Sequence, residues 1–283
     1  MSSEVVNPEL SEVRGPSALG GGFKRMLDLV LLLSITEFKR TYFGTALGYL
    51  WSVARPLMIF AVLLEVFTHV FRLGSSVPHY PVLLLFNIVL FGFFSESTTT
   101  AVTSIVGQEG IVRKTQFPRI VIPLSVVVTA LINLGLNMIV VFAFILGFGI
   151  WPMWSWLLFP FVVVLLFVFS TAVSMIVASL YPRFRDIGII WAVFSTALFY
   201  ATPVLYPIEK APAGLRSVIS LNPITPLLGV ARKLVIDPDA PGPRSPVAGG
   251  VSHLLGAMAI YAAVCVLAVW VFNREAPRIA EQL

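Results

Sequence analysis

The chain has 283 residues, of which 58% are hydrophobic and only 12% are charged, and its mean hydropathy is +0.92. This composition excludes a soluble globular protein, and at about 20 apolar residues per span the chain has room for about six membrane spans and no second domain. The net charge of +5 does not indicate nucleic-acid binding, because the Lys and Arg residues lie in short segments between apolar runs, where they set membrane orientation. We therefore expect an all-α integral membrane protein.

The N-terminal part precedes the first apolar run that is long enough to cross a bilayer. Residues 1–22 lack the basic start and the apolar core of a cleavable signal peptide, so we expect a disordered cytoplasmic tail. Residues 23–43 contain an apolar stretch that is too short to span and is flanked by charged residues on both sides. Most of these charges fall on one half of a helical wheel, which predicts an amphipathic helix in the cytoplasmic membrane interface.

Six apolar runs follow, and each is long enough to cross the membrane once. The expected spans are residues 51–71, 82–106, 120–148, 156–180, 187–205 and 254–272. With their connections they form one transmembrane domain over residues 44–275, followed by a cytoplasmic tail over residues 276–283.

Loop charge sets the expected orientation. Basic residues gather in loops 108–119 and 181–186, which are therefore expected to be cytoplasmic, as are both termini. The long connection before the last span also carries Lys and Arg, but long loops contribute little to orientation. Within it, residues 215–235 are semi-apolar and interrupted by Pro223 and Pro226, so a re-entrant or surface helix is expected there.

The sequence offers no motif for nucleotide, metal or nucleophilic chemistry. It contains no G-x-x-x-x-G-K-[ST] phosphate loop, so ATP would have to be bound and hydrolysed by a partner. The three histidines, His69, His79 and His253, are not spaced with acids or cysteines as metal ligands or as a nucleophile-activating pair. The single cysteine, Cys265, cannot form an intrachain disulfide. We therefore expect no cofactor and no enzymatic activity in this chain.

Three charged residues fall within or at the edge of predicted spans, where a charge is costly and often functional. Glu96 lies in a hydroxyl-rich segment, residues 95–100, whose side chains could satisfy it in a helix–helix interface, so we favour a structural role over catalysis or proton relay. Glu65 has no such neighbours in the sequence. Arg55 could snorkel to the interface, the simpler interpretation, or pair with an acidic group.

Aromatic residues are frequent in the first predicted span and around the fifth. They are Trp51, Phe60, Phe67, Trp191, Phe194, Phe199, Tyr200 and Tyr206. Most could serve as interfacial belt and packing residues. They could also line a translocation path for sugars, since flat rings stack on pyranose or furanose faces without tight hydrogen bonds. The composition leaves both interpretations open.

Several short motifs occur in a fixed order along the chain. They are YFGTALGYLW at 42–51, RPL at 55–57, FFSES at 93–97, Lys114, FPR at 117–119, IPLS at 122–125, FRD at 184–186, TPVLYP at 202–207 and LNP at 221–223. In this order they resemble the membrane subunit of type-2 ABC exporters of polysaccharides, over about residues 23–272. The resemblance implies the ABC-2 (type V exporter) transmembrane fold. Arg55 departs from the usual N-P-L of that family.

What the resemblance implies about partners goes beyond the residues themselves. It implies a homodimer with two copies of an ABC ATPase subunit that binds Mg-ATP, and export of a lipid-linked polysaccharide across the plasma (inner) membrane of a bacterium. O-antigen, teichoic acid and galactan exporters are all similar. It also implies a cytoplasmic coupling helix over residues 109–119 beside the interface helix. The residues implied in ATPase coupling are Glu109, Arg113, Lys114, Phe117, Pro118, Arg119, Arg185 and Asp186.

Other interpretations remain at this point. The basic residues of the coupling segment could set topology alone. A type-2 ABC exporter of a drug or small lipid would share the fold and the partner without needing sugar-stacking rings, so substitution of Trp191 and Tyr200 would leave export unaffected. An intramembrane glycosyl- or acyltransferase would need acids or histidines gathered at one membrane face, and Glu65 and Glu96 are too sparse for that. A proton-coupled carrier would often show paired broken helices in two repeated halves, and that pattern is not visible in this sequence.

Overall fold

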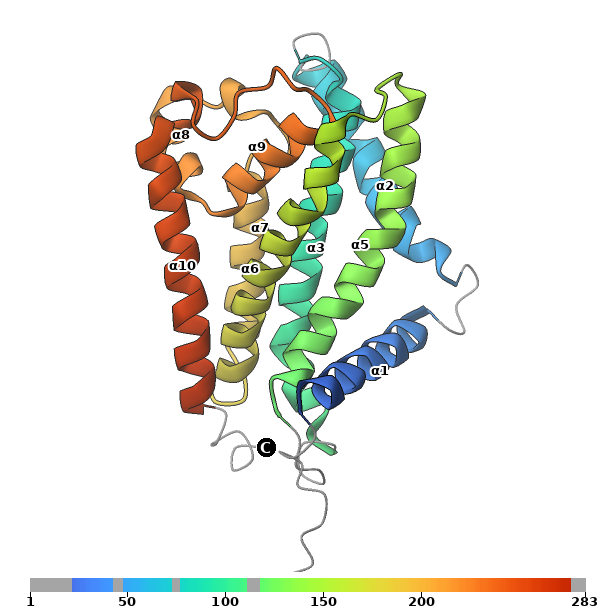
Figure 1. The fold of residues 1–283 in the computed structure, drawn as a ribbon, viewed down its shortest axis with the longest axis vertical. Coiled ribbons are helices and arrows are strands. Elements are labelled where there is room, and N and C mark those ends of the chain that lie inside the picture. The colour runs from blue at the N-terminus through green and yellow to red at the C-terminus, as the bar shows by residue number, and fades with distance from the viewer. Residues whose placement is uncertain (1–21, 43–47, 73–76, 111–117, 276–283) are drawn as a thin grey trace, which may run out of the picture.

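The computed structural model describes residues 22–42, 48–72, 77–110 and 118–275, and every regular element in these ranges is helical. The longer helices are α1 (Gly22–Tyr42), α2 (Leu50–Glu65), α3 (Tyr80–Gly107), α5 (Val121–Gly147), α6 (Phe159–Leu180), α7 (Ile187–Ala201) and α10 (Gly250–Glu275). The shorter elements are the π-helical η1 (Val66–Val70), the 3-10 turns η3 (Trp154–Leu158), η4 (Ile208–Lys210) and η5 (Pro246–Ala248), and the helices α8 (Ala213–Leu221) and α9 (Ile224–Val235). Figure 1 shows the long helices as an upright bundle, with α1 lying obliquely at one end and α8 and α9 at the other.

Five helical segments within the described ranges are long and apolar enough to cross a membrane. They are Leu50–Val70, Tyr80–Gly107, Val121–Gly147, Trp154–Leu180 and Gly250–Glu275, and the number rises to six if the bent pair α8–α9 counts as one span. Each of the five overlaps an expected span, which confirms the all-α membrane fold class.

The remaining expected span, residues 187–205, is only partly helical. Helix α7 has 15 residues and stops at Ala201, because Thr202 precedes Pro203 and takes extended backbone angles, φ −90° and ψ 146°. The sequence therefore placed this helix correctly but extended it past its proline-imposed end.

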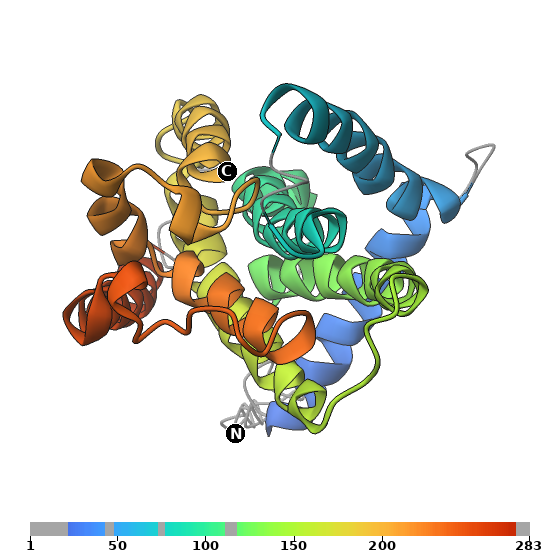
Figure 2. The same ribbon diagram turned by 90° about the horizontal axis from the view of Figure 1, so that it is seen from above.

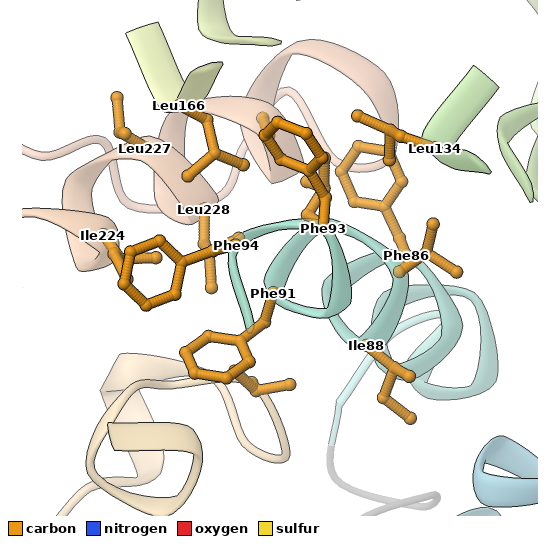
Figure 3. Packing of buried hydrophobic residues seen from close by; sticks show 14 of the residues in the cluster. Phe86, Ile88, Phe91, Phe93, Phe94, Leu134, Leu166, Ile224, Leu227 and Leu228 are labelled. Atoms are coloured by element: carbon orange, nitrogen blue, oxygen red, sulfur yellow. The ribbon is translucent and has the colours of Figure 1, made fainter. Parts of the chain in front are cut away.

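Helix α3 is the centre of the bundle. It packs against α2, α5, α6, α7 and α9, and in the view of Figure 2 it stands between α2 on one side and α6 and α7 on the other. Its first half is buried on every side, with Phe86, Phe91, Phe93 and Phe94 all at most 2% exposed. Figure 3 shows these rings pointing outward from α3 toward the neighbouring helices. Such side chains hold membrane helices together mainly through van der Waals packing.

Helix α1 is fastened to α5 by a polar contact. The Ser34 hydroxyl lies 2.7 Å from the carbonyl oxygen of Val30 and 2.9 Å from that of Ser125, and the Thr129 hydroxyl donates to the Ser34 carbonyl at 3.2 Å. On the opposite side of α1, Leu32 is 63% exposed, and Phe23 near the start of the helix is 77% exposed. A helix thus occupies the range expected for the interface helix, and its position at the membrane surface stays a prediction.

Loss of the Ser34 hydroxyl should loosen α1 from α5. Ser34→Ala removes a buried hydrogen bond worth about 1 kcal/mol, which corresponds to about fivefold faster hydrogen–deuterium exchange of the α1 amides. Thr36→Ala is the matched control, because the Thr36 hydroxyl is exposed and bonds only to the carbonyl of Leu32 in its own helix. Equal exchange rates in the two variants would contradict this role for Ser34.

The other end of the bundle is capped by a helical corner. Helices α8 and α9 meet at 90° next to Pro223. The side chain of Asn222 stabilises the corner, since its Oδ1 accepts from the backbone N–H of Ile224 at 3.0 Å and its Nδ2 donates to the Thr202 hydroxyl at 2.8 Å. The proline-interrupted segment 215–235 is therefore helical, but in two short pieces rather than one, and its expected re-entrant or surface position stays a prediction.

Candidate functional site

One face of α3 is polar and uncovered along its second half. Glu96, Thr99, Thr100 and Thr103 are exposed and recur at the three- and four-residue spacing of one helix face. We call these four residues the α3 polar stripe. Residues 82–91 of the same helix are buried, so the stripe begins where the surrounding helices stop covering α3.

Glu96 is the charged member of the stripe, and side chains from three other helices surround it. The Asn133 Nδ2 of α5 donates a hydrogen bond to Glu96 Oε1. Arg55 of α2 lies within electrostatic reach of the carboxylate. Tyr42, at the end of α1, lies within hydrogen-bonding reach of Asn133 and within electrostatic reach of both charges. We call Tyr42, Arg55, Glu96 and Asn133 the Glu96 cluster.

The electrostatics of the cluster favour a neutral phenol at Tyr42. Burial first, and the negative charge of Glu96 second, raise the pKa of Tyr42 above its ordinary value of 10.0. Tyr42 therefore keeps its proton at physiological pH and remains a hydrogen-bond donor. The cluster thus joins the interface helix candidate α1 to the interior of the bundle.

The hydroxyl neighbours of Glu96 do not satisfy it, contrary to the expectation from the sequence. The Ser97 and Thr98 hydroxyls donate to the Phe94 carbonyl at 3.0 Å and 2.8 Å, because in a helix the nearest acceptors are the carbonyls three and four residues back. The Ser95 hydroxyl instead lies 3.1 Å from the Ser195 hydroxyl and ties α3 to α7. The partner of Glu96 is Asn133, a residue 37 positions away that the sequence analysis missed.

A signal for Asn133 was present in the sequence. Asn133 and Asn137 are spaced four residues apart in an otherwise apolar run, so they share a face of α5. Asn137 Nδ2 donates to the carbonyl of Ser52 at 3.2 Å and joins α5 to α2. Polar residues spaced four residues apart within a span lie on one face of the helix and indicate a helix–helix contact.

The helices beside the stripe present apolar surfaces. On α2 and η1, Met58, Ile59, Val62 and Val66 are exposed, and on α7, Ile189, Ile190, Val193 and Phe194 are exposed. These side chains suit lipid or another apolar protein surface. A carboxylate and three hydroxyls do not suit hydrocarbon, because a charge near the bilayer centre costs several kcal/mol. The α3 polar stripe therefore faces water or polar groups.

Six of the eight aromatic residues that the sequence singled out fall into two groups. Phe60, Phe199 and Trp191 are packing residues: Phe60 meets Phe144 with centroids 5.6 Å apart, Phe199 meets Phe91 at 5.4 Å, and Trp191 meets Phe94 at 6.4 Å. The second group consists of surface residues, with Trp51, Phe194 and Tyr200 exposed by 42%, 50% and 59%.

The other two aromatic residues lie in η1 and in the connection between α7 and η4. Phe67 stacks on Phe71 with centroids 4.9 Å apart, and the Tyr206 hydroxyl donates to the Tyr200 carbonyl at 3.2 Å. The eight rings thus do not share one face of the chain, and a role in translocation stays a prediction for those on the surface.

The three charged residues of the spans have different surroundings. Glu65 and His69, one helical turn apart, approach to 3.2 Å on an exposed surface of α2 and η1. Arg55, for which the sequence left two interpretations open, lies within electrostatic reach of Glu96. Of the three charged residues, Arg55 and Glu96 are thus the two that influence each other.

The expected coupling residues lie toward the α1 end of the bundle, insofar as the structure describes them. Arg113, Lys114 and Phe117 lie outside the described residues, while Glu109, Pro118 and Arg119 flank that gap. Their role in coupling stays a prediction.

The α6–α7 connection gathers positive charge at the same end (Figure 1). Arg185 lies over the Tyr181 ring at 5.1 Å, Arg183 lies 3.9 Å from Glu275 of α10, and Asp186 precedes the first residue of α7. Arg185 and Asp186 are exposed there and accessible to a partner.

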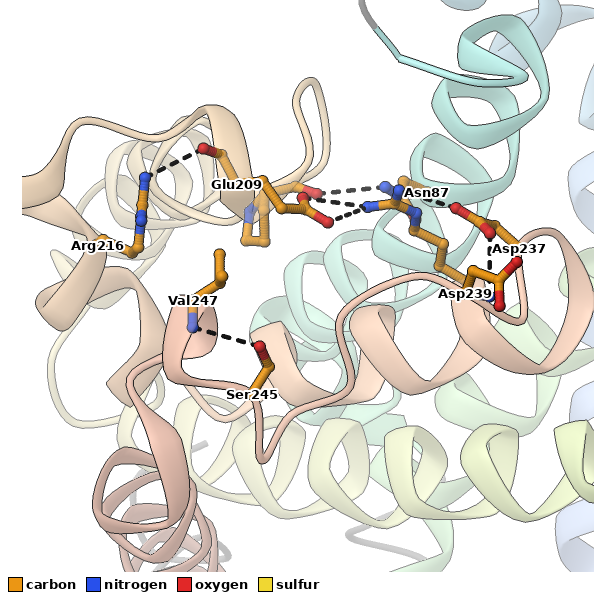
Figure 4. Close-up of polar contacts among 9 residues, drawn as sticks. Asn87, Glu209, Arg216, Asp237, Asp239, Ser245 and Val247 are labelled. Carbon is orange, nitrogen blue, oxygen red and sulfur yellow. Dashed lines mark hydrogen bonds and ion pairs between the residues drawn. The ribbon is translucent and has the colours of Figure 1, made fainter.

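The opposite end holds a separate ionic cluster that the sequence analysis did not single out. Arg232 Nη1 lies 3.0 Å from Glu209 Oε1, and Arg232 Nη2 lies 3.3 Å from Asp237 Oδ2 (Figure 4). Arg216 donates to the carbonyls of Glu209 and Ala211 at 3.1 Å and 2.9 Å. A small cavity beside this cluster, lined in part by Asn87, has a volume of about 40 Å³. It has room for a few water molecules and is much smaller than a typical ligand pocket of about 300–1,000 Å³.

Comparison with known proteins identifies the relatives of the chain. The family model described as "ABC-2 type transporter" matches residues 28–236. The O-antigen export system permease protein RfbA of Myxococcus xanthus is 33% identical over 202 residues, which cover 70% of this chain and 77% of the relative. A protein of the same name from Klebsiella pneumoniae is 30% identical over 204 residues, covering 72% and 78%. The polysialic acid transport protein KpsM of Escherichia coli is 20% identical over 220 residues, covering 76% and 84%.

Proposed function

Because the chain belongs to the ABC-2 type transporter family, we propose that it is the membrane subunit of an ATP-driven exporter of a cell-surface polysaccharide. The relatives at 29–33% identity are named as O-antigen export permeases, and they cover most of this chain. The chain itself has no phosphate loop, so ATP hydrolysis belongs to a separate ATPase subunit. The site of action is the inner membrane of a bacterium.

The structural observation that carries this proposal is the α3 polar stripe. Polysaccharides are rich in hydroxyl groups, which need hydrogen-bonding partners or water throughout a membrane crossing. An exposed carboxylate and three hydroxyls on one face of the central helix supply such a surface. An exporter of a drug or small lipid, the alternative, would be served by the apolar surfaces of α2 and α7 and would not need the stripe.

The proposed orientation follows from charge. The α1 end carries Arg183 and Arg185 in the α6–α7 connection and Lys39 and Arg40 at the end of α1. Positive residues in short loops remain on the cytoplasmic side, so the α1 end is cytoplasmic and the α8–α9 corner faces outward. The ATPase would bind at the α1 end, to the segment 109–119 and to Arg185 and Asp186.

The proposed assembly has two copies of this chain and two ATPase subunits. One chain exposes the polar stripe along its surface, and a second copy related by twofold symmetry would enclose a path between two such stripes. Mass measurement of the complex purified in mild detergent would test this. Two copies of each subunit are expected, and a stable complex with a single copy of this chain would contradict the arrangement.

Depletion of the chain in its native host tests the function. Export should stop, so that lipid-linked glycan accumulates inside and surface glycan is lost, and an ATPase subunit should copurify with the chain. Mass spectrometry of the accumulated lipid-linked sugars would identify the substrate. The proposal would be wrong if depletion left the surface glycan unchanged and no ATPase subunit copurified.

A further inference from the structure

The α3 polar stripe combines complementary hydrogen-bonding groups. The Glu96 carboxylate is an acceptor, the Arg55 guanidinium within its electrostatic reach is a donor, and the hydroxyls of Thr99, Thr100 and Thr103 can act as both. Sugar hydroxyl groups are likewise both donors and acceptors, so each has a partner on this surface. Neither hydrocarbon nor an apolar solute has hydrogen-bond donors or acceptors that could pair with these side chains.

The carboxylate is held in place before any ligand arrives. Asn133 on α5 donates to one of its oxygens, which leaves Oε2 free of that bond and fixes the side chain on the exposed face of α3. Because Arg55 and Asn133 belong to different helices from Glu96, the geometry of the acceptor depends on how α2, α3 and α5 pack. A preorganised polar group binds more tightly than a mobile one, because less conformational entropy is lost on binding.

The stripe is long and lies in one half of the membrane. From Glu96 to Thr103 is seven residues, or about 10 Å along the helix, which exceeds the contact length of one side chain. From Glu96 to the end of α3 at Gly107 is about 16 Å, so the stripe occupies the half of the helix next to the α1 end. In the proposed orientation this is the cytoplasmic half.

A symmetric second copy alone does not explain the stripe. If two stripes packed directly on each other across a twofold axis, Glu96 would lie near its own symmetry mate, and the two negative charges would repel. The exposed apolar residues of α2 and α7 are better suited to such direct packing. If the two copies pack through those apolar residues, the stripe lines the space between the copies.

From these contacts we propose that the α3 polar stripe binds the sugar hydroxyl groups of the glycan as it enters the pathway. Glu96, positioned by Asn133, accepts hydrogen bonds from the sugar, and Arg55 donates hydrogen bonds to the sugar. The three threonine hydroxyls bind further sugar hydroxyl groups along the helix. This inference rests on the proposed function and adds to it the residues and the part of the pathway that contact the substrate.

Cysteine labelling tests whether the stripe is wet and whether glycan covers it. Single cysteines are introduced as Thr99→Cys and Thr103→Cys in a Cys265→Ser background, because Cys265 is the only native cysteine. Val266→Cys on α10 is the control, since Val266 is 71% exposed on an apolar helix. The probe is a charged methanethiosulfonate reagent applied to membranes that contain the complete transporter.

The expected labelling has two parts. The stripe cysteines should react at least about tenfold faster than the Val266→Cys control, since a charged reagent is excluded from hydrocarbon. Labelling should fall in membranes from cells that make the lipid-linked glycan, compared with cells that lack its first sugar transferase. Stripe cysteines that react as slowly as the control, or that react equally in both membranes, would overturn the proposal.

A second pair of variants tests binding through the rate of glycan export. Glu96→Gln and the double variant Thr99→Val with Thr103→Val should each lower the rate of glycan export at least about tenfold. The first variant weakens a hydrogen bond to a charged group, and the second removes two hydrogen bonds to neutral groups. Thr171→Val is the control, because this threonine lies on α6 and bonds to the Phe167 carbonyl of its own helix. Unchanged thermal unfolding of each variant would exclude a folding defect.

The outcomes separate this inference from the proposed function. If depletion of the chain stops export while Glu96→Gln and the threonine variant export normally, the stripe does not bind glycan and the proposed function stands. If depletion itself leaves export unchanged, the proposed function fails as well.

Discussion

Replacing Arg232 by alanine should destabilise the outward end of the chain by about 3–5 kcal/mol, since removal of one partner leaves the other charges of a buried cluster uncompensated. The Arg232 side chain is only 12% exposed, and it serves two carboxylates, Glu209 at 25% exposure and Asp237 at 21%. Both carboxylates would remain in their partly buried positions without a counter-charge. The thermal unfolding midpoint of the purified protein should fall by about 10 °C, since each kcal/mol corresponds to a few degrees in a chain of this size.

The neighbouring residue gives a matched control for this prediction. Lys233 carries the same charge on the same helix, and its side chain is exposed. Lys233→Ala should therefore change the unfolding midpoint very little, because exposed charges contribute at most about 1 kcal/mol. If the two alanine variants unfolded at the same temperature, the ionic cluster would not be what stabilises the connection between α7 and α10.

Replacing Phe94 by alanine should destabilise the bundle by about 3–5 kcal/mol, the range measured for large-to-small changes in packed cores. Phe94 is 1% exposed and contacts Phe169 of α6 with ring centroids 5.8 Å apart and Trp191 of α7 at 6.4 Å. Within a membrane there is little hydrophobic gain from bringing helices together, so the lost energy is that of van der Waals contacts and of the cavity. The loss should appear as a lower unfolding midpoint and as dissociation of α7 from α3.

Phe161 offers the comparison for Phe94. It lies on α6 and is 63% exposed, so Phe161→Ala opens no cavity inside the protein. Thermal unfolding of both variants in the same detergent, together with hydrogen–deuterium exchange of the α7 amides, would measure the difference. Similar midpoints and similar exchange would show that the aromatic contacts around α3 contribute little to helix packing.

The sequence predicted the helices well because the signals for them are local. Long apolar runs place five of the spans, and the proline after Thr202 marks the end of α7 even though the expected span continued to residue 205. The break between α8 and α9 was likewise visible at Pro223. These signals depend only on neighbouring residues, so one sequence is enough to read them.

The contacts within the site could not be read in the same way. Glu96 was recognised as exceptional, but its partner was sought among adjacent hydroxyls, which bond to their own helix instead. Asn133 and Arg55 reach it only because α5 and α2 pack beside α3, and that packing is determined by the whole bundle. The ionic cluster of Arg232 was missed for the same reason, since Glu209 lies 23 residues away.

The burial of the first half of α3 has a consequence for the energy balance of the cell. Polar surface on this helix stops at Glu96, and residues 82–91 beyond it are enclosed by aromatic and aliphatic side chains. An ion or proton that followed the stripe would meet a region of low dielectric constant that it cannot enter without a large loss of hydration energy. Along α3 itself an ion therefore cannot cross the outward half of a copy, which limits the leakage that would dissipate the electrochemical gradient of the membrane.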